Sequence, residues 1–130
     1  MSYPYTAFVT LLVLLLYFVL AGNAGRARAK YGVMAPAVTG NEMFERAYRV
    51  QMNTLEQMVF FLPAMWIYAI FLTDIGGAVS GLLWVAARSF YAVSYLRDPK
   101  TRGPGALGTV VVEVGTFLGA AYGVLRSMFG

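Results

Sequence analysis

The chain contains no cysteine and no histidine, and few of its 130 residues carry charge. The two absences exclude disulfides, zinc sites of the Cys/His kind, haem ligation by either residue, cysteine nucleophiles and Ser-His triads. Thiol or imidazole chemistry at this protein must therefore come from a bound ligand. Charged residues make up 12% of the chain, whereas an ordinary soluble domain has about 25%. Hydrophobic residues make up 59%, which is typical of a membrane protein.

Four long apolar runs contain most of these hydrophobic residues. Each run can reach about 18–22 helical residues, which is enough to cross a bilayer. The predicted spans lie at about residues 5–27, 44–72, 76–97 and 104–127. Since four spans leave no room for a soluble domain, residues 1–130 are expected to form one integral-membrane domain. Short connections between the spans predict an all-α, antiparallel four-helix bundle.

The first apolar run has an alternative interpretation as a secretory signal peptide, with Gly22-Asn23-Ala24 as a loose cleavage site. Against it, residues 1–5 carry no positive side chain, and the run exceeds the usual length of about 7–15 residues. We therefore favour a membrane span.

The basic residues are concentrated in two of the three connections. They are Arg26, Arg28, Lys30, Arg46 and Arg49 in and around the first, and Arg97, Lys100 and Arg102 in the third. The second connection, residues 73–77, and the first 25 residues contain no cation. The positive-inside rule therefore predicts that the first and third loops are cytoplasmic and that both termini lie on the opposite side. The net charge of +4 then reflects orientation and requires no nucleic-acid partner.

Glu56 lies one turn inside the second span, whose apolar part runs from Met58 to Leu72. These fifteen residues rise only about 22 Å as a helix, whereas a bilayer core is about 30 Å thick. The span must therefore include Asn53 and Glu56, which share one helical face with Arg49. A charged group at that depth costs about 2.5–3.5 kcal/mol, so it persists only when it is paired or lines a wet cavity.

A second polar face lies on the third span, where Arg88, Tyr91 and Tyr95 are spaced at i, i+3 and i+7. The second helix enters the bilayer from the side to which the third returns. Both polar faces are therefore expected at the same depth, near the inner leaflet. Together they predict a pocket for a zwitterionic ligand, in which arginines bind carboxylates, Glu56 binds an ammonium group and tyrosines bind amide or carboxylate oxygens.

Each of these residues also has a structural interpretation. Arginines near the end of a span are often snorkelling anchors, and tyrosines are often part of an aromatic belt. Asn53 and Glu56 are candidates for hydrogen bonds to Arg88 between helices. Glu113 in the fourth span is interpreted as a buried partner of Arg88, with a substrate-related role as the alternative.

Three stretches of the chain form a recognisable pattern: residues 44–56 (FERAYRVQMNTLE), Ala87-Arg88 and Tyr91-x-x-x-Tyr95. They resemble the MAPEG family, the membrane-associated proteins of eicosanoid and glutathione metabolism. The Arg-x-x-x-Asn-x-x-Glu spacing that opens the second span is the most specific element. The resemblance covers residues 28–102 and four spans of matching length, and it is nearest to the microsomal glutathione transferase and cysteinyl-leukotriene synthase branch.

The resemblance implies a homotrimer with one glutathione at each subunit interface, at the cytoplasmic end. The residues that would contact this tripeptide are Arg49, Asn53, Glu56, Tyr91 and Tyr95. A neighbouring subunit would supply Arg28 and Gln51. Arg102 matches the arginine that activates the thiol in catalytic members. We add Arg88 to the candidate binding residues because it shares the polar face of the third span.

The chemistry expected of Arg102 is electrostatic. A thiol has a pKa near 8.5, and its thiolate is the nucleophile. A desolvated guanidinium beside the sulfur stabilises the anion, and each unit of pKa lowering corresponds to about 1.4 kcal/mol. Because arginine stays protonated, it cannot be the base. The implied function is a membrane-bound glutathione transferase that conjugates glutathione, its co-substrate, to lipophilic electrophiles in the membrane lipid, or reduces lipid hydroperoxides, without a metal.

Two positions depart from the family pattern. Gln57 stands where a tyrosine is often found, and Ala29 stands where a second arginine adjoins Arg28. Both departures are expected to change the affinity for glutathione, and another small thiol is an alternative ligand.

Three other functions remain open. The first is a non-catalytic lipid- or glutathione-binding protein of the same fold. Such a protein need not keep Arg102 together with the full motif of the second span, and this chain has both. A small multidrug antiporter needs a carboxylate in the first span to couple protons to cations, and residues 5–22 contain none. The third is a scaffold protein without a ligand, and the predicted convergence of the polar residues argues against it.

Overall fold

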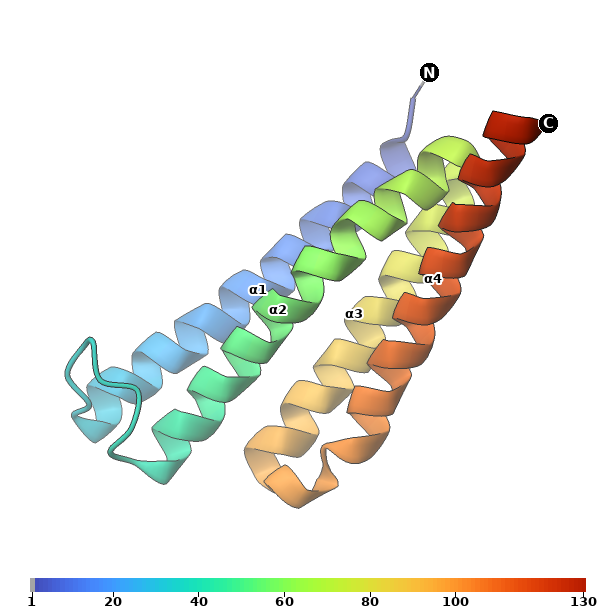
Figure 1. The fold of residues 1–130 in the computed structure, drawn as a ribbon. Coiled ribbons are helices and arrows are strands. Elements are labelled where there is room, and N and C mark those ends of the chain that lie inside the picture. The colour runs from blue at the N-terminus through green and yellow to red at the C-terminus, as the bar shows by residue number, and fades with distance from the viewer. Residues whose placement is uncertain (1) are drawn as a thin grey trace.

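The computed structural model describes residues 2–130 as four long helices, in which consecutive helices run antiparallel (Figure 1). They are α1 (Pro4–Tyr31), α2 (Glu42–Phe71), α3 (Asp74–Arg97) and α4 (Gly103–Phe129), with a short 3-10 helix, η1 (Pro99–Thr101), before α4. The α1–α2 and α3–α4 connections lie at one end of the bundle, and both termini lie at the other. The predicted all-α four-helix architecture is confirmed.

Three parts of the structure are long and apolar enough to cross a membrane, by length and composition: α1, α2 and the segment Pro99–Phe129. The third predicted span, α3, is less apolar than these three. α3 has 24 residues, which corresponds to about 36 Å and suffices for a bilayer, but Arg88, three glycines and three serines make it less apolar. These polar positions are tolerated because α3 packs against all three other helices.

The helix ends follow from local sequence. α1 ends at Tyr31 because Gly32 adopts a left-handed conformation with φ 69°, which glycine reaches without a Cβ clash. It extends four residues beyond the C-terminal end of the predicted span, residue 27. α2 begins after Asn41, whose side-chain oxygen accepts a hydrogen bond from the Phe44 backbone N–H at 3.0 Å. Pro63 lies inside α2 without ending it, as is common in membrane helices.

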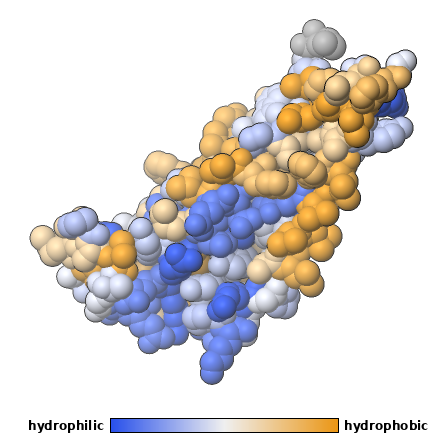
Figure 2. Space-filling view, in the orientation of Figure 1, coloured by the Kyte–Doolittle hydropathy of each residue, from blue (hydrophilic) through white to orange (hydrophobic). Residues whose placement is uncertain are grey.

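Side chains that face the interior form two apolar clusters, one in the half of the bundle that holds the termini and one nearer the connections α1–α2 and α3–α4. In the first, the rings of Phe61 and Trp84 stack with centroids 5.1 Å apart. The second contains Leu20, Val50 and Tyr91. Many large hydrophobic side chains remain exposed on the outer surface. Figure 2 shows that hydrophilic residues gather at the end with the two connections, so the surface has the division expected of a protein in a bilayer.

Gly105 sets the distance between α3 and α4 beside the polar residues. A Cβ at this position would lie 2.6 Å from Tyr91 Cα and 2.7 Å from Tyr91 N. These are backbone atoms that cannot rotate away, so a side chain here must push the two helices apart. The close approach therefore requires glycine.

We expect Gly105→Ala to lower the stability of the protein by about 1–3 kcal/mol, the usual cost of overpacking a well-packed contact. Gly103→Ala is the matched control, because it also lies in the first turn of α4 and a Cβ there meets no atom within 4 Å. Thermal unfolding of both variants in detergent checks the prediction. Equal melting temperatures for the two variants would contradict it.

Candidate functional site

The centre of the polar site is the Arg88 guanidinium, which lies on α3 and is only 1% exposed. Its Nη2 donates to Asn53 Oδ1 at 2.8 Å and to Thr54 Oγ1 at 2.9 Å, both on α2. Its Nη1 makes a longer contact, 3.5 Å, with Thr109 Oγ1 on α4. The guanidinium carbon also lies 4.2 Å from the centroid of the Tyr91 ring. One buried cation therefore joins three helices.

Arg88 Nε remains buried without a hydrogen-bond partner among residues 2–130. A buried donor without a partner is uncommon in folded proteins, because its desolvation is not compensated. Since Arg88 also lines a cavity, an acceptor atom from a ligand or a water is the partner expected there.

The cavity beside Arg88 has a volume of about 170 Å³ and lies among α2, α3 and α4. Its lining residues are Asn53, Gln57, Arg88, Tyr91, Arg102, Ala106, Thr109 and Val110. Four of the predicted site residues thus surround one space. Ligand pockets usually measure about 300–1,000 Å³, so this cavity can hold part of a tripeptide but not all of it.

The predicted activating residue lies at the edge of this cavity. Arg102 is exposed, and its Nη1 donates to the Pro99 carbonyl oxygen at 3.1 Å. Its guanidinium carbon is 5.9 Å from the centroid of the Tyr95 ring. That ring in turn packs on Tyr91, with centroids 5.7 Å apart. Arg102, Tyr95 and Tyr91 therefore form a continuous polar and aromatic wall that leads from the bundle end to Arg88.

Arg49 and Glu56 lie on the outer face of α2 with exposed side chains, and Asn53 lies between them, partly buried. Neither charged side chain forms an ion pair within residues 2–130. In Figure 2 a hydrophilic stripe runs from the polar end toward the middle of the bundle, with hydrophobic surface beside it. Unpaired charges at this depth are costly in contact with lipid, so this stripe requires a polar partner.

Two predicted residues point away from the cavity. Arg28 Nη1 donates to the carbonyl oxygens of Val33 at 3.3 Å and Ala37 at 2.8 Å, and its guanidinium carbon is 4.6 Å from the Phe44 ring centroid. Gln51 Nε2 donates to the Tyr17 hydroxyl of α1 at 3.2 Å. Within one chain, Arg28 holds the first loop and neither residue lines the cavity.

A second polar group, formed by Glu113 and Gln57, lies behind the cavity, and the contact between these two residues was not predicted from the sequence. Glu113 on α4 is 6% exposed and accepts a hydrogen bond from Trp84 Nε1 at 3.1 Å. With the Gln57 amide nitrogen turned toward this carboxylate, Gln57 donates to its two oxygens at 2.6 and 2.9 Å. Glu113 forms no ion pair with Arg88 in the described residues, contrary to the interpretation as its direct partner. A lone carboxylate inside an apolar run was the signal available in the sequence.

Thr54 and Thr109 were also missed, because a single threonine in a membrane helix is common. Each hydroxyl also donates to the carbonyl four residues earlier, Val50 and Gly105 respectively. In residues 2–130, no group of three or more acidic residues is arranged to hold a metal ion.

The fold and the site define the class: an all-α integral membrane bundle with a buried polar network near one end. The chain belongs to the MAPEG family, whose model matches residues 6–122. It is 47% identical over 116 residues to an uncharacterized protein of Synechocystis sp., covering 86% of this chain and 85% of that protein. It is 34% identical over 105 residues to human (Homo sapiens) microsomal glutathione S-transferase 2, covering 80% and 70%. It is 36% identical over 96 residues to leukotriene C4 synthase of Bos taurus, covering 74% and 64%.

Proposed function

We propose that this protein is a membrane-bound glutathione transferase, which activates the thiol of glutathione for attack on lipophilic electrophiles or lipid hydroperoxides. The observation that carries the proposal is the cavity shared by Asn53, Arg88, Tyr91 and Arg102, with its unpartnered Arg88 Nε. The similarity to a protein named microsomal glutathione S-transferase 2 supports it. That similarity supports a glutathione-using membrane enzyme at the family level, and the reaction is the finer part of the proposal.

The proposed binding mode assigns the charges of the tripeptide to the stripe on α2. The cavity of about 170 Å³ takes one part of the ligand, and Arg49 and Glu56 bind a carboxylate and the ammonium group outside it. Arg28 and Gln51 join them from a neighbouring subunit of a homotrimer. The support for this assembly is the outward direction of Arg49 and Glu56, since a partner subunit with its ligand supplies the polar surroundings that lipid lacks.

In the proposed mechanism, Arg102 lowers the pKa of the glutathione thiol by stabilising the thiolate. The thiolate then attacks an electrophilic carbon, forming the carbon–sulfur bond while the leaving group departs with the bonding electrons. With a hydroperoxide, it attacks the terminal oxygen, and the oxygen–oxygen bond breaks as the alkoxide leaves and takes a proton from water to become the alcohol. A second glutathione then converts the sulfenic product to the disulfide and water. The protein supplies position and charge, and no side chain becomes a covalent intermediate.

The membrane orientation that we propose places this site at the cytoplasmic face. The connections beside it, α1–α2 and α3–α4, and the helix ends that flank them carry eight of the ten cations, and such segments are retained on the cytoplasmic side. Lipophilic acceptors then reach the site laterally from the bilayer, while glutathione reaches it from the aqueous phase.

A conjugation assay tests the proposal. Detergent-purified protein is incubated with glutathione and a chlorinated nitrobenzene, and a hydroperoxide reduction assay is run beside it. Measurable turnover in either assay supports the transferase. Bound glutathione with no turnover in both assays favours the second candidate, a non-catalytic glutathione- or lipid-binding protein. The observation that favours this second candidate is that the Arg102 side chain is exposed and donates a hydrogen bond to the Pro99 carbonyl oxygen.

We expect Glu56→Ala to raise the dissociation constant of glutathione about threefold to tenfold, because an ion pair at an exposed site contributes modestly. The matched control is Glu42→Ala, which removes an exposed carboxylate from the first turn of α2 that pairs with Arg46. Isothermal titration of the two purified variants gives the comparison. If both variants bind as the unaltered protein does, Glu56 is not a ligand.

A further inference from the structure

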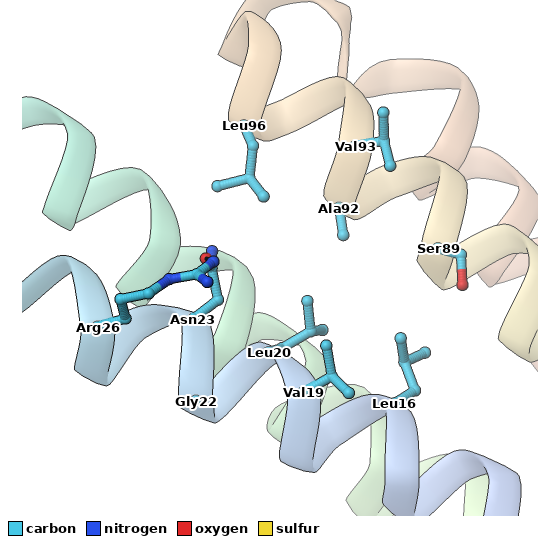
Figure 3. A pocket seen from close by; sticks show the side chains of 10 residues that line it. All are labelled: Leu16, Val19, Leu20, Gly22, Asn23, Arg26, Ser89, Ala92, Val93 and Leu96. Atoms are coloured by element: carbon cyan, nitrogen blue, oxygen red, sulfur yellow. Dashed lines mark hydrogen bonds between the residues drawn. The ribbon is translucent and has the colours of Figure 1, made fainter.

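A large groove lies between α1 and α3 and shares no lining residue with the polar cavity. Its volume is about 500 Å³, well within the range of ligand pockets. Figure 3 shows side chains of both helices bordering it. Most of its lining residues are aliphatic, namely Leu16, Val19, Leu20, Ala92, Val93 and Leu96, so the groove suits a hydrocarbon chain.

One end of the groove is cationic. Arg26 Nη2 donates to Asn23 Oδ1 at 2.9 Å at this end (Figure 3). A second hollow of about 470 Å³ shares Asn23, Arg26 and Leu96 with the groove and extends to Lys30. The two hollows therefore form one trough, which is aliphatic toward the middle of the bundle and basic toward the connections.

The charges of Arg26 and Lys30 are uncompensated. Both side chains are exposed, and they lie one turn apart on α1. Neither forms an ion pair within residues 2–130, and Lys30 Nζ lies 5.4 Å from the centroid of the Tyr31 ring. The chain has only six acidic residues. One of them, Glu113, is buried, and Glu42 already pairs with Arg46, so a second copy has four other carboxylates to offer against ten basic residues.

We propose that the trough binds an anionic phospholipid, with an acyl chain between α1 and α3 and the phosphate beside Arg26 and Lys30. The dimensions agree, since Leu16 and Arg26 are ten residues apart, or about 15 Å along the helix, half of a bilayer core of about 30 Å. The aliphatic part excludes a free phosphate ion, and the cations favour an anionic headgroup over a zwitterionic one. The inference is independent of the proposed transferase activity.

The test is a lipid titration of the full-length protein in detergent, read by native mass spectrometry. Phosphatidylglycerol is expected to bind at least tenfold more tightly than phosphatidylcholine. The double variant Arg26→Gln, Lys30→Gln is expected to remove this preference, because each cation near a headgroup contributes about fivefold. The control is Lys100→Gln with Arg126→Gln, which makes the same change of charge at two other exposed positions.

A second pair of variants tests the acyl-chain part. Gly22 lines the groove, and a Cβ there meets no atom within 4 Å, so the side chain of Gly22→Phe is expected to enter the groove with no clash at its Cβ. This variant is expected to weaken the binding of phosphatidylglycerol at least fivefold. Gly25→Phe is the control, because Gly25 is exposed, has equally open surroundings and does not line the groove.

Three results would overturn the proposal. The first is equal affinity for the two lipids in the unaltered protein. The second is displacement of phosphatidylglycerol by millimolar inorganic phosphate, which would identify a simple anion site. The third is a change in oligomer distribution without a change in lipid binding for Gly22→Phe, which would show that a second copy covers the groove.

Discussion

Replacing Arg102 with alanine is expected to reduce turnover at least tenfold while the dissociation constant of glutathione changes little. The guanidinium borders the cavity and contacts the ring of Tyr95, where it can stabilise a thiolate. Losing that stabilisation raises the pKa of the bound thiol, and one pKa unit is a tenfold loss of thiolate at neutral pH. Steady-state kinetics and glutathione titration on the same preparation separate the two effects.

The pH profile distinguishes activation from positioning. In Arg102→Ala, the acid limb of the pH profile of kcat/KM for the electrophile, measured at saturating glutathione, is expected to move to higher pH. Activity is expected to recover in part above pH 9. Arg102→Lys keeps a positive charge and is expected to retain part of the turnover. Arg97→Ala is the control, because Arg97 is exposed at the same end of the bundle. An unchanged pH profile with equal loss of binding and turnover would show that Arg102 only positions the ligand.

Replacing Arg88 with methionine is expected to lower the free energy of unfolding by about 3–5 kcal/mol. The substitution keeps much of the side-chain volume but leaves Asn53, Thr54 and Thr109 without their donor inside the bundle, and each unpaired buried group costs about 1–3 kcal/mol. Breaking a buried charged network by removing one member has a similar total effect. Denaturant titration in mixed micelles, followed by circular dichroism, measures the loss.

Two further variants show whether the loss comes from the hydrogen-bond network of Arg88. Arg88→Lys keeps the charge but cannot reach acceptors on two helices with one planar group, so an intermediate loss is expected. Arg126→Met changes an exposed arginine in the last turn of α4 and is expected to leave stability unchanged. Equal stability of Arg88→Met and Arg126→Met would mean that the network does not hold the helices together.

Helical periodicity was sufficient to predict the contact between the polar faces of α2 and α3. The spacing of Asn53, Arg88 and Tyr91 places each on a known face, and the antiparallel order brings those faces to the same depth. The structure accordingly places Asn53 Oδ1 2.8 Å from Arg88 Nη2. The roles of these residues as ligands of glutathione stay predictions.

Contacts that depend on the rotation and spacing of helices were not predictable from the sequence. Gln57 was interpreted only as a departure from a family pattern, yet it contacts Glu113 across the α2–α4 interface. The groove beside Arg26 was likewise not predicted, because it depends on the distance between α1 and α3, whose residues line its two sides.

The sequence by itself determined that this chain is a membrane bundle, how many helices it has and which faces are polar. Hydrophobic length and 3.6-residue periodicity are local properties, and the bilayer imposes them directly. Only the tertiary structure decided which polar groups share a cavity, which way Arg28 and Gln51 point, and where a lipid-sized groove remains. Those features depend on interhelical distances, which close packing sets through contacts such as Gly105 against Tyr91.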